Sequence, residues 1–203
     1  MRRKITFILA GCIILLQTFA APGLSCVGRI LTVSVNDSIE QKLIGQLLAT
    51  YITERTGTTV NMVTGLDTRA SEELIKQCKA DIFINYINVG LADIDGAGTI
   101  ENDQEAYGLV KQYYDEKFEL VWLRPLGYKG PLLQGVENTA ENTSLAIPVT
   151  TKEVLNRFPV LDRVINKLGG RIDKRTLQQL ILETETKEIA VVVKEFLKDQ
   201  NLI

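Results

Sequence analysis

The stretch R-I-L-T-V-S-V-N-D-S-I-E-Q-K-L-I-G-Q-L-L-A-T-Y-I-T-E-R-T-G, residues 29–57, has the pattern of a strand, a turn and a helix. Residues 29–35 are rich in β-branched side chains, and the following Asn and Asp favour a turn. Ser38 and Gln41 have the spacing of a capping box at a helix start. Gly57 is a typical helix stop. Between them the apolar residues recur on one helical face, namely Ile39, Leu43, Ile44, Leu47, Leu48, Tyr51 and Ile52.

The same alternation continues along the chain. We expect further strands at residues 58–63, 81–84, 118–123 and 145–147, and helices at residues 69–79 and 104–117. A loop rich in Gly and Asp is expected at residues 90–102, and three helical pieces are expected from Thr151 onward, with breaks at Gly169-Gly170 and near Glu183. Strands that alternate with helices over residues 29–123 predict an α/β fold with a parallel sheet covered on both faces.

The composition excludes several classes of protein. The chain has 203 residues, 45% of them hydrophobic and 24% charged, which is typical of a globular protein with a real core. It contains no histidine, which rules out a Ser-His-Asp triad, an imidazole base and a His-ligated zinc site. The net charge of −2 argues against a nucleic-acid partner. No catalytic constellation is recognisable, so we expect no enzyme, no metal site and no cofactor.

The first twenty residues have the pattern of a signal peptide. Residues 2–4 are basic, and residues 5–16 form an apolar run that is too short to span a bilayer comfortably. Small residues at 18 and 20 predict cleavage after Ala20. Residues 21–203 would then be a single exported α/β domain, located in the periplasm or another extracytoplasmic space.

Two alternatives to simple cleavage remain open. The tetrapeptide Leu9-Ala10-Gly11-Cys12 matches the residue pattern of a lipobox, with Cys12 as the lipidated residue. Cys26 follows a sequence that matches this pattern less well. An uncleaved N-terminal anchor is the second alternative. Either would attach the protein to the membrane.

Cys26 and Cys78 would remain after cleavage after Ala20, in an oxidising compartment. Cys26 precedes the first expected strand and Cys78 ends the helix that leads to the third, so both belong to one edge of the α/β layer. We expect either a Cys26–Cys78 disulfide bond, which the chain-entropy model values at about 3–4 kcal/mol, or two unrelated thiols. Lipidation of Cys26 would exclude the bond.

Several segments together resemble one family. They are E-Q-K-L-I-G-Q-L-L at 40–48, A-D-I-F-I-N-Y at 80–86, F-E-L-V-W-L-R-P-L-G-Y at 118–128, and the C-terminal stretch from Thr151 through Phe158-Pro159 and Gly169-Gly170 to Phe196-Leu197. The resemblance is to the extracytoplasmic substrate-binding proteins of ABC transporters for glycine betaine, choline and related quaternary ammonium osmoprotectants. It implies a periplasmic-binding-protein type II fold, a small quaternary ammonium solute, and the membrane permease of an ABC transporter as a partner.

The chain departs from the pattern of that family in two ways. The family has two lobes, and its second lobe lies where this chain has only residues 129–144. On the order of a hundred residues, one small domain's worth, are therefore expected to be missing. The pocket motifs have also changed, since N-D-S at 36–38, D-T at 67–68 and F-I-N-Y-I-N-V at 83–89 replace the family's usual segments. The resemblance thus implies a single lobe with a helical C-terminal segment and one wall of a cleft.

The expected ligand site combines aromatic rings with polar turns. Quaternary ammonium groups are held over ring faces, and open α/β sheets bind ligands at the carboxyl ends of their strands. The candidate residues are Asn36, Asp37, Ser38, Asp67, Asn85, Tyr86, Asn88 and Tyr128. Alternative roles remain open at this point: Asp37 or Ser38 caps its own helix, Tyr128 lies on a connecting loop, and Trp122, a third ring, packs in the core.

Two functions from different classes follow. The first is a solute-binding component of an osmoprotectant transporter, in which a second copy or another protein supplies the missing wall of the cleft. The second is an exported protein-interaction module without a small ligand. In that case the former cleft would expose Ile84, Ile87 and Val89 as an apolar docking surface.

Overall fold

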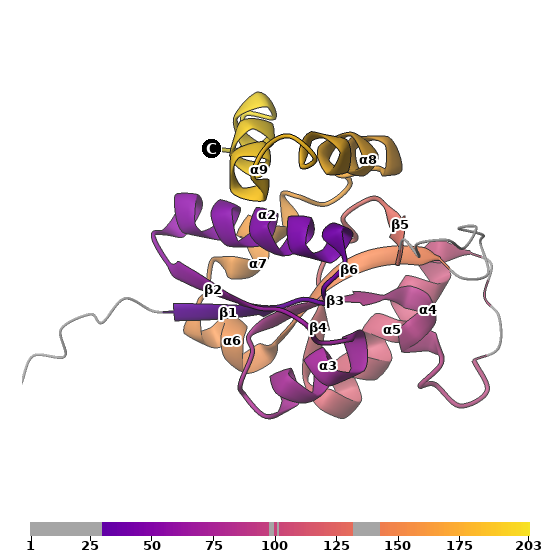
Figure 1. The fold of residues 1–203 in the computed structure, drawn as a ribbon. Coiled ribbons are helices and arrows are strands. Elements are labelled where there is room, and N and C mark those ends of the chain that lie inside the picture. Colours follow the sequence, from indigo (N-terminus) through magenta and orange to yellow (C-terminus); the bar gives the residue numbers. More distant parts are fainter. Residues whose placement is uncertain (1–29, 98–99, 101, 132–142) are drawn as a thin grey trace, which may run out of the picture.

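A single sheet lies between two layers of helices in the computed structural model, which describes residues 30–97, 100, 102–131 and 143–203 (Figure 1). The strands are β1 (Ile30–Ser34), β2 (Thr59–Val63), β3 (Ile82–Tyr86), β4 (Leu120–Trp122), β5 (Lys129–Gly130) and β6 (Ser144–Thr151). Their order is β2-β1-β3-β6-β4, and β5 pairs with β6. β1 is parallel to β2 and β3, whereas β6 is antiparallel to both β3 and β4. The expected α/β lobe is confirmed, with one antiparallel strand inserted into it.

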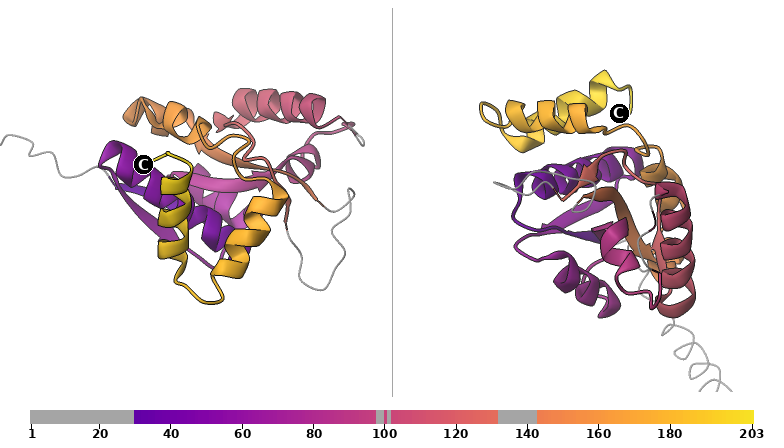
Figure 2. Two further views of the ribbon diagram at one scale, coloured as in Figure 1. Left: turned by 90° about the horizontal axis from the view of Figure 1, so that it is seen from above. Right: turned by 90° about the vertical axis from the view of Figure 1, so that its right-hand side faces the viewer.

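Helices cover both faces of this sheet (Figures 1 and 2). They are α2 (Ile39–Thr56), α3 (Thr68–Lys76), α4 (Ile87–Leu91), α5 (Asp103–Phe118), α6 (Lys152–Arg157), α7 (Leu161–Asn166), α8 (Lys174–Glu183) and α9 (Ile189–Asp199). Helix α2 packs on β1 and β2 and is itself covered by α7, α8 and α9. Helices α3, α4 and α5 lie on the opposite face. None of the helices within these described ranges is long and apolar enough to cross a membrane.

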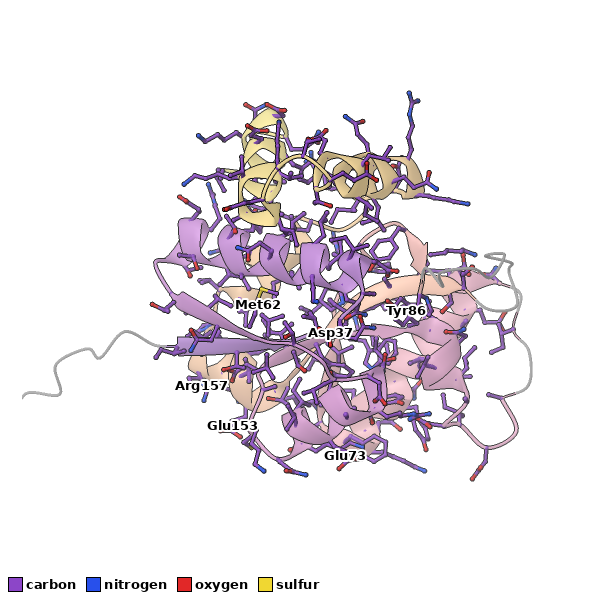
Figure 3. The ribbon with its side chains drawn as sticks, viewed as in Figure 1. Asp37, Met62, Glu73, Tyr86, Glu153 and Arg157 are labelled. Carbon is purple, nitrogen blue, oxygen red and sulfur yellow. The ribbon has the colours of Figure 1, made fainter. Side chains whose placement is uncertain are left out.

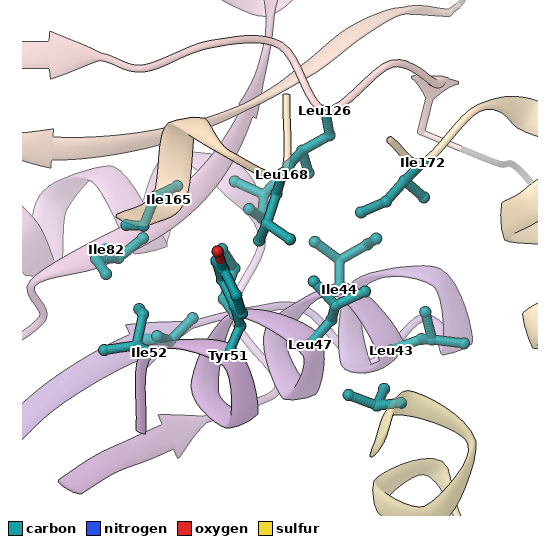
Figure 4. Close-up of a cluster of buried hydrophobic side chains, with 14 of the residues drawn as sticks. Leu43, Ile44, Leu47, Tyr51, Ile52, Ile82, Leu126, Ile165, Leu168 and Ile172 are labelled. Carbon is teal, nitrogen blue, oxygen red and sulfur yellow. The ribbon is translucent and has the colours of Figure 1, made fainter. Parts of the chain in front are cut away.

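Helix α2 has only half of the capping box expected from its sequence, because the backbone N–H of Ser38 donates to Asn36 and not to Gln41. The hydroxyl of Ser38 accepts a hydrogen bond from the backbone N–H of Gln41 at 3.2 Å. At the other end Gly57 adopts a left-handed conformation with φ of 71°, which glycine tolerates without strain, and its N–H donates to the carbonyl of Thr53. The apolar stripe of α2 is buried against β1 and the C-terminal helices (Figure 4).

Two apolar cores lie on the two faces of the sheet because side chains alternate along each strand. On β3, Ile82 and Ile84 belong to the larger core around α2. Phe83, between them, belongs to the smaller core, where Trp122 packs against Tyr114 with 5.2 Å between ring centroids. Trp122 is therefore a core residue, as the alternative interpretation of the sequence has it.

Several sequence expectations need correction. The C-terminal region forms four helices instead of three pieces, because the chain breaks at Phe158-Pro159, where proline cannot continue helical hydrogen bonding. β6 extends beyond the expected 145–147, and the expected loop at 90–102 begins inside α4. Helix α3 ends at Lys76, so Cys78, with φ of 56°, is exposed and does not lie on the inner side of that helix.

The predicted Cys26–Cys78 bond stays a prediction, because Cys26 lies outside the described residues. Cys78 does lie near the edge at which β1 begins: the backbone N–H of Asp81 donates to the carbonyl of Thr32 at 2.8 Å. The Cys78 thiol is 4.0 Å from the carboxylate of Glu153. The expected signal peptide and both lipidation positions also fall outside the described residues.

The carboxylate of Asp93 ties the segment after α4 to two helices. It accepts hydrogen bonds from Arg69 of α3, at 2.5 Å, and from the hydroxyl of Tyr114 of α5. Its backbone carbonyl also accepts from the Tyr113 hydroxyl at 2.8 Å. Burial alone would raise the pKa of Asp93, but the hydrogen bonds from Arg69 and Tyr114 outweigh it and lower that pKa below 3.8.

We expect Asp93→Asn to lower the free energy of unfolding by about 1–2 kcal/mol at neutral pH, since a charge-assisted pair becomes a neutral one. A depressed carboxyl pKa stabilises the protein above the unfolded-state value, and this stabilisation is lost as pH falls through the folded-state pKa. The difference between the two proteins should therefore shrink below pH 3.8. Urea unfolding at several pH values measures it, with exposed Asp95→Asn as the control; a difference that stays constant with pH contradicts the prediction.

Candidate functional site

Polar residues gather where β1, β2 and β3 end. Because these strands are parallel, their carboxyl ends lie at one edge of the sheet. Of the expected site residues, those at this edge are Asn36, Asp37 and Ser38 after β1, Asp67 after β2, and Asn85, Tyr86 and Asn88 at the end of β3 and in α4. Figure 3 shows Asp37 and Tyr86 toward this end, and Glu153 and Arg157 toward the other. The topology thus brings seven of the expected residues to one edge.

The polar groups after β1 and β2 are engaged with their own chain. Asn36 accepts from the backbone N–H of Ser38 at 2.9 Å, and Ser38 caps α2. Asp67 caps α3 by accepting from the N–H of Ala70 at 2.8 Å. Exposed Asp37 forms an ion pair with Lys42 at 2.9 Å. These turns therefore contribute two exposed carboxylates at the edge, and the N-terminal N–H groups of α2 are partly satisfied by Ser38.

Tyr86 lies in a buried polar cluster that the sequence did not assign to the site. Its hydroxyl donates to Oε1 of Glu40 and accepts from Nε2 of Gln41, both at 2.8 Å. Tyr86, Glu40 and Gln41 are at most 2% exposed. Glu40 and Gln41 are the first two residues of the E-Q-K segment, so the motif itself was the signal that could have identified them.

Tyr128 completes this cluster from the segment before β5. It is 1% exposed, so it does not lie on an open loop. Its hydroxyl faces the Glu40 carboxylate and the Tyr86 hydroxyl without reaching hydrogen-bond geometry with any described residue. Nδ2 of Asn85 is likewise buried without a partner among the described residues. Buried polar groups are normally satisfied, so two such groups near one edge are unusual.

Burial and the nearby Glu40 carboxylate raise the pKa of Tyr86 well above 10. Burial, together with Tyr86 and Glu40, raises the pKa of Tyr128 in the same direction. Both phenols therefore keep their protons at physiological pH and can donate hydrogen bonds. Two neutral rings beside a carboxyl group form an environment whose charge suits a cation.

The backbone of β5 approaches this cluster closely. A Cβ on Gly130 would lie 2.7 Å from Oε1 of Glu40 and 2.9 Å from Cε1 of Tyr86, so only glycine fits there. Asn88 is held by two hydrogen bonds to Ser144 of β6. The Ser144 hydroxyl donates to the side-chain carbonyl of Asn88 at 2.7 Å, and the backbone N–H of Asn88 donates to the Ser144 hydroxyl oxygen at 2.9 Å. β5 thus packs directly on the cluster, and Ser144 of β6 holds Asn88 at the same edge of the sheet.

The prediction of an exposed apolar docking surface at Ile84, Ile87 and Val89 is wrong. Ile84 and Ile87 are 1% and 2% exposed, because they belong to the two cores, and Val89 is half-buried against the larger one. Without these side chains, the observation that favoured a protein-interaction module is lost.

Comparisons with known proteins agree on one kind of protein. The model of a family described as the substrate-binding domain of the ABC-type glycine betaine transport system matches residues 30–145, more than half of the chain. A crystal structure titled glycine betaine/carnitine/choline ABC transporter matches with a TM-score of 0.73 and 16% identity, over 87% of this chain and 99% of that one. The structure of apo YehZ from Escherichia coli matches with a TM-score of 0.70 and 15% identity, over 85% of this chain and 99% of that one.

A third structure is lactococcal OpuAC in its closed-liganded conformation, complexed with glycine betaine. It matches with a TM-score of 0.55 and 10% identity, over 85% of this chain and 96% of that one. At these identities the structural matches establish a shared fold, the periplasmic-binding-protein type II fold.

Proposed function

The chain belongs to the family of substrate-binding domains of ABC-type glycine betaine transport systems, and on that premise we propose that it binds a quaternary ammonium solute outside the cytoplasm. Its partner would be the membrane permease of an ABC transporter. Proteins of this family bind solutes for transporters and are not enzymes.

The observation that carries the proposal is the cluster of Glu40, Tyr86 and Tyr128 behind the carboxyl edge of β3. A quaternary ammonium group has no N–H to donate, so it is recognised by ring faces and negative charge. The cluster supplies two rings and a carboxyl group, and the exposed carboxylates of Asp37 and Asp67 add negative charge at the same edge. The Tyr128 hydroxyl, which has no hydrogen-bond partner among the described residues, is a donor that suits the carboxylate of a betaine.

We propose further that the protein is a single lobe. β5 and β6 pair directly, with Lys129 opposite Leu145 and Gly130 opposite Ser144, so the chain returns to the sheet close to where it leaves. The segment between these strands, 131–143, is too short for a second lobe. One wall buries less of a ligand than two do, so we expect weak binding unless a second copy or another protein supplies the opposite wall.

The proposed location rests on the N-terminal sequence. Residues 1–20 would direct export and be removed, leaving residues 21–203 in the periplasm or another extracytoplasmic space. Lipidation at Cys12 or Cys26, or a retained signal, would keep the protein at the membrane.

Thermal unfolding of the purified protein with glycine betaine, choline, carnitine and proline betaine tests the proposed function. A ligand at a hundred times its dissociation constant adds about 2.7 kcal/mol, which raises the melting temperature by several degrees. A larger shift at higher protein concentration would indicate a site shared between copies. No shift with any of these compounds would contradict the proposal.

A double variant, Asp37→Asn/Asp67→Asn, examines the charges at the edge. Asparagine caps a helix as well as aspartate does at position 67, and the exposed ion pair of Asp37 with Lys42 contributes little, so we expect little loss of stability. Choline, a cation, should bind less tightly by a factor of about 3–10, whereas zwitterionic glycine betaine should change less. Asp162→Asn/Asp199→Asn, an exposed pair on α7 and α9, is the matched control for the change in charge. An equal effect of both double variants would remove these carboxylates from the site.

A further inference from the structure

A concave basic pocket lies at the opposite end of α2 from the Glu40–Tyr86 cluster. Fifteen residues separate Glu40 from Arg55, which corresponds to about 22 Å along a helix. The pocket has a volume of about 450 Å³, within the range of small-ligand sites. Four cationic side chains from three segments line it: Arg55 of α2, Arg124 after β4, and Lys167 and Arg171 between α7 and α8.

These positive charges have no counter-charge among the described residues that line the pocket. No Asp or Glu lines the pocket, and none of the four cations forms an ion pair with a residue of the described ranges. The protein as a whole carries a net charge of −2, so the cluster does not reflect a general excess of basic residues. Four like charges around one cavity repel one another, and an anion bound between them would remove that repulsion.

Backbone hydrogen bonds fix the segments that carry the cations. The N–H of Arg124 donates to Oδ1 of Asn166 at 2.8 Å, which joins the segment after β4 to α7. The N–H of Gly170 donates to the carbonyl of Pro125 at 3.1 Å, which places Arg171 beside the same segment. The pocket is therefore assembled by tertiary contacts before any ligand arrives.

Tyr51 forms part of the pocket wall. Its ring is buried in the larger core, and Figure 4 shows its hydroxyl directed toward the segment of Leu168. Burial raises the pKa of Tyr51, while the charges of Arg55 and Arg171 act on it in the opposite direction. Both guanidinium groups thus lie close enough to act on one phenol at the wall of the cavity.

We propose that this pocket binds a phosphoryl group, carried either by a soluble molecule or by the headgroup of an anionic phospholipid. Planar guanidinium groups bind two oxygens of a phosphate at once, and three arginines with a lysine match a ligand that carries two negative charges. The proposal does not depend on the solute site, which lies at the other end of α2.

Binding of two probes to the purified protein at low ionic strength tests the proposal. Inorganic phosphate is titrated by calorimetry, and vesicles of phosphatidylglycerol and phosphatidylcholine are tested by co-sedimentation against pure phosphatidylcholine. Arg124→Gln/Arg171→Gln should weaken binding at least about tenfold, because each arginine contributes a charge-assisted contact. The matched control is Arg163→Gln/Arg175→Gln, which removes two exposed arginines outside the pocket. It should change the affinity less than about twofold.

The two probes separate the two sources of the phosphoryl group. Binding of inorganic phosphate but not of vesicles indicates a soluble ligand, and binding of anionic vesicles but not of inorganic phosphate indicates a headgroup. Either result supports the proposed pocket if Arg124→Gln/Arg171→Gln weakens that binding by the expected factor. If that variant fails to fold, Arg55→Gln on the exposed surface of α2 replaces it. The proposal is overturned if neither probe binds, or if the pocket variant and the control bind equally well.

Discussion

Trp122→Ala should lower the free energy of unfolding by about 3–5 kcal/mol, the largest effect that we expect from a single substitution. The Trp122 side chain is fully buried in the smaller core and packs against Tyr114. A Cβ on Gly90 would lie 2.7 Å from Cη2 of the indole, so the ring fills its space completely. Alanine would leave a large cavity between α4, α5 and the sheet, which these packed elements can close only in part.

Trp122→Phe provides the graded comparison. The indole Nε1 has no hydrogen-bond partner among the described residues, so phenylalanine removes volume without breaking a hydrogen bond. We expect a loss of about 1–2 kcal/mol for this variant. Chemical unfolding must be followed by circular dichroism, because Trp122 is the only tryptophan in the sequence. A loss below about 1.5 kcal/mol for Trp122→Ala would mean that the smaller core collapses around the missing ring.

Local signals in the sequence were sufficient for the first half of the fold. Ser38, Gln41 and Gly57 set the ends of α2 through contacts within a few residues, and the structure has those contacts. β6 was underestimated, since the expected strand ended at residue 147, before Pro148 and Thr150. Its full length depends on pairing with both β3 and β4, which are distant in the sequence. Strand formation of this kind follows from context more than from local propensity.

The candidate site, too, could be predicted where it depends on strand direction and could not where it depends on contacts between distant residues. Topology alone places Asp37, Asp67 and Tyr86 at one edge, because parallel strands share a direction. Sequence reasoning left out Glu40, since a glutamate in the first turn of a helix is ordinarily exposed and helps the helix dipole. Its burial depends on Tyr86 and Tyr128, which lie far along the chain. Such a partner cannot be identified from local pattern.

Tyr86→Phe should lower the free energy of unfolding by about 2–3 kcal/mol, because the buried Glu40 carboxylate loses a hydrogen-bond donor. In a Glu40→Gln background the same substitution should cost about 1 kcal/mol, since a neutral amide is less expensive to leave unpaired. The coupling energy in this double-mutant cycle is then about 1–2 kcal/mol. Tyr107→Phe is the matched control, since its hydroxyl donates to the neutral backbone carbonyl of Leu123 at 2.8 Å.

The pH dependence gives a second readout for the contact between Tyr86 and Glu40. The pKa of Tyr86 is raised above 10 in the folded protein, so its stabilising effect is complete below pH 10 and is lost as pH rises through the folded-state pKa. The difference between wild type and Tyr86→Phe should therefore shrink in strong alkali and stay constant near neutrality. Equal losses in the Glu40 and Gln backgrounds would show that the hydroxyl acts independently of the carboxyl group. The proposed solute site would then retain the two rings but lose the carboxylate–phenol contact that orients them.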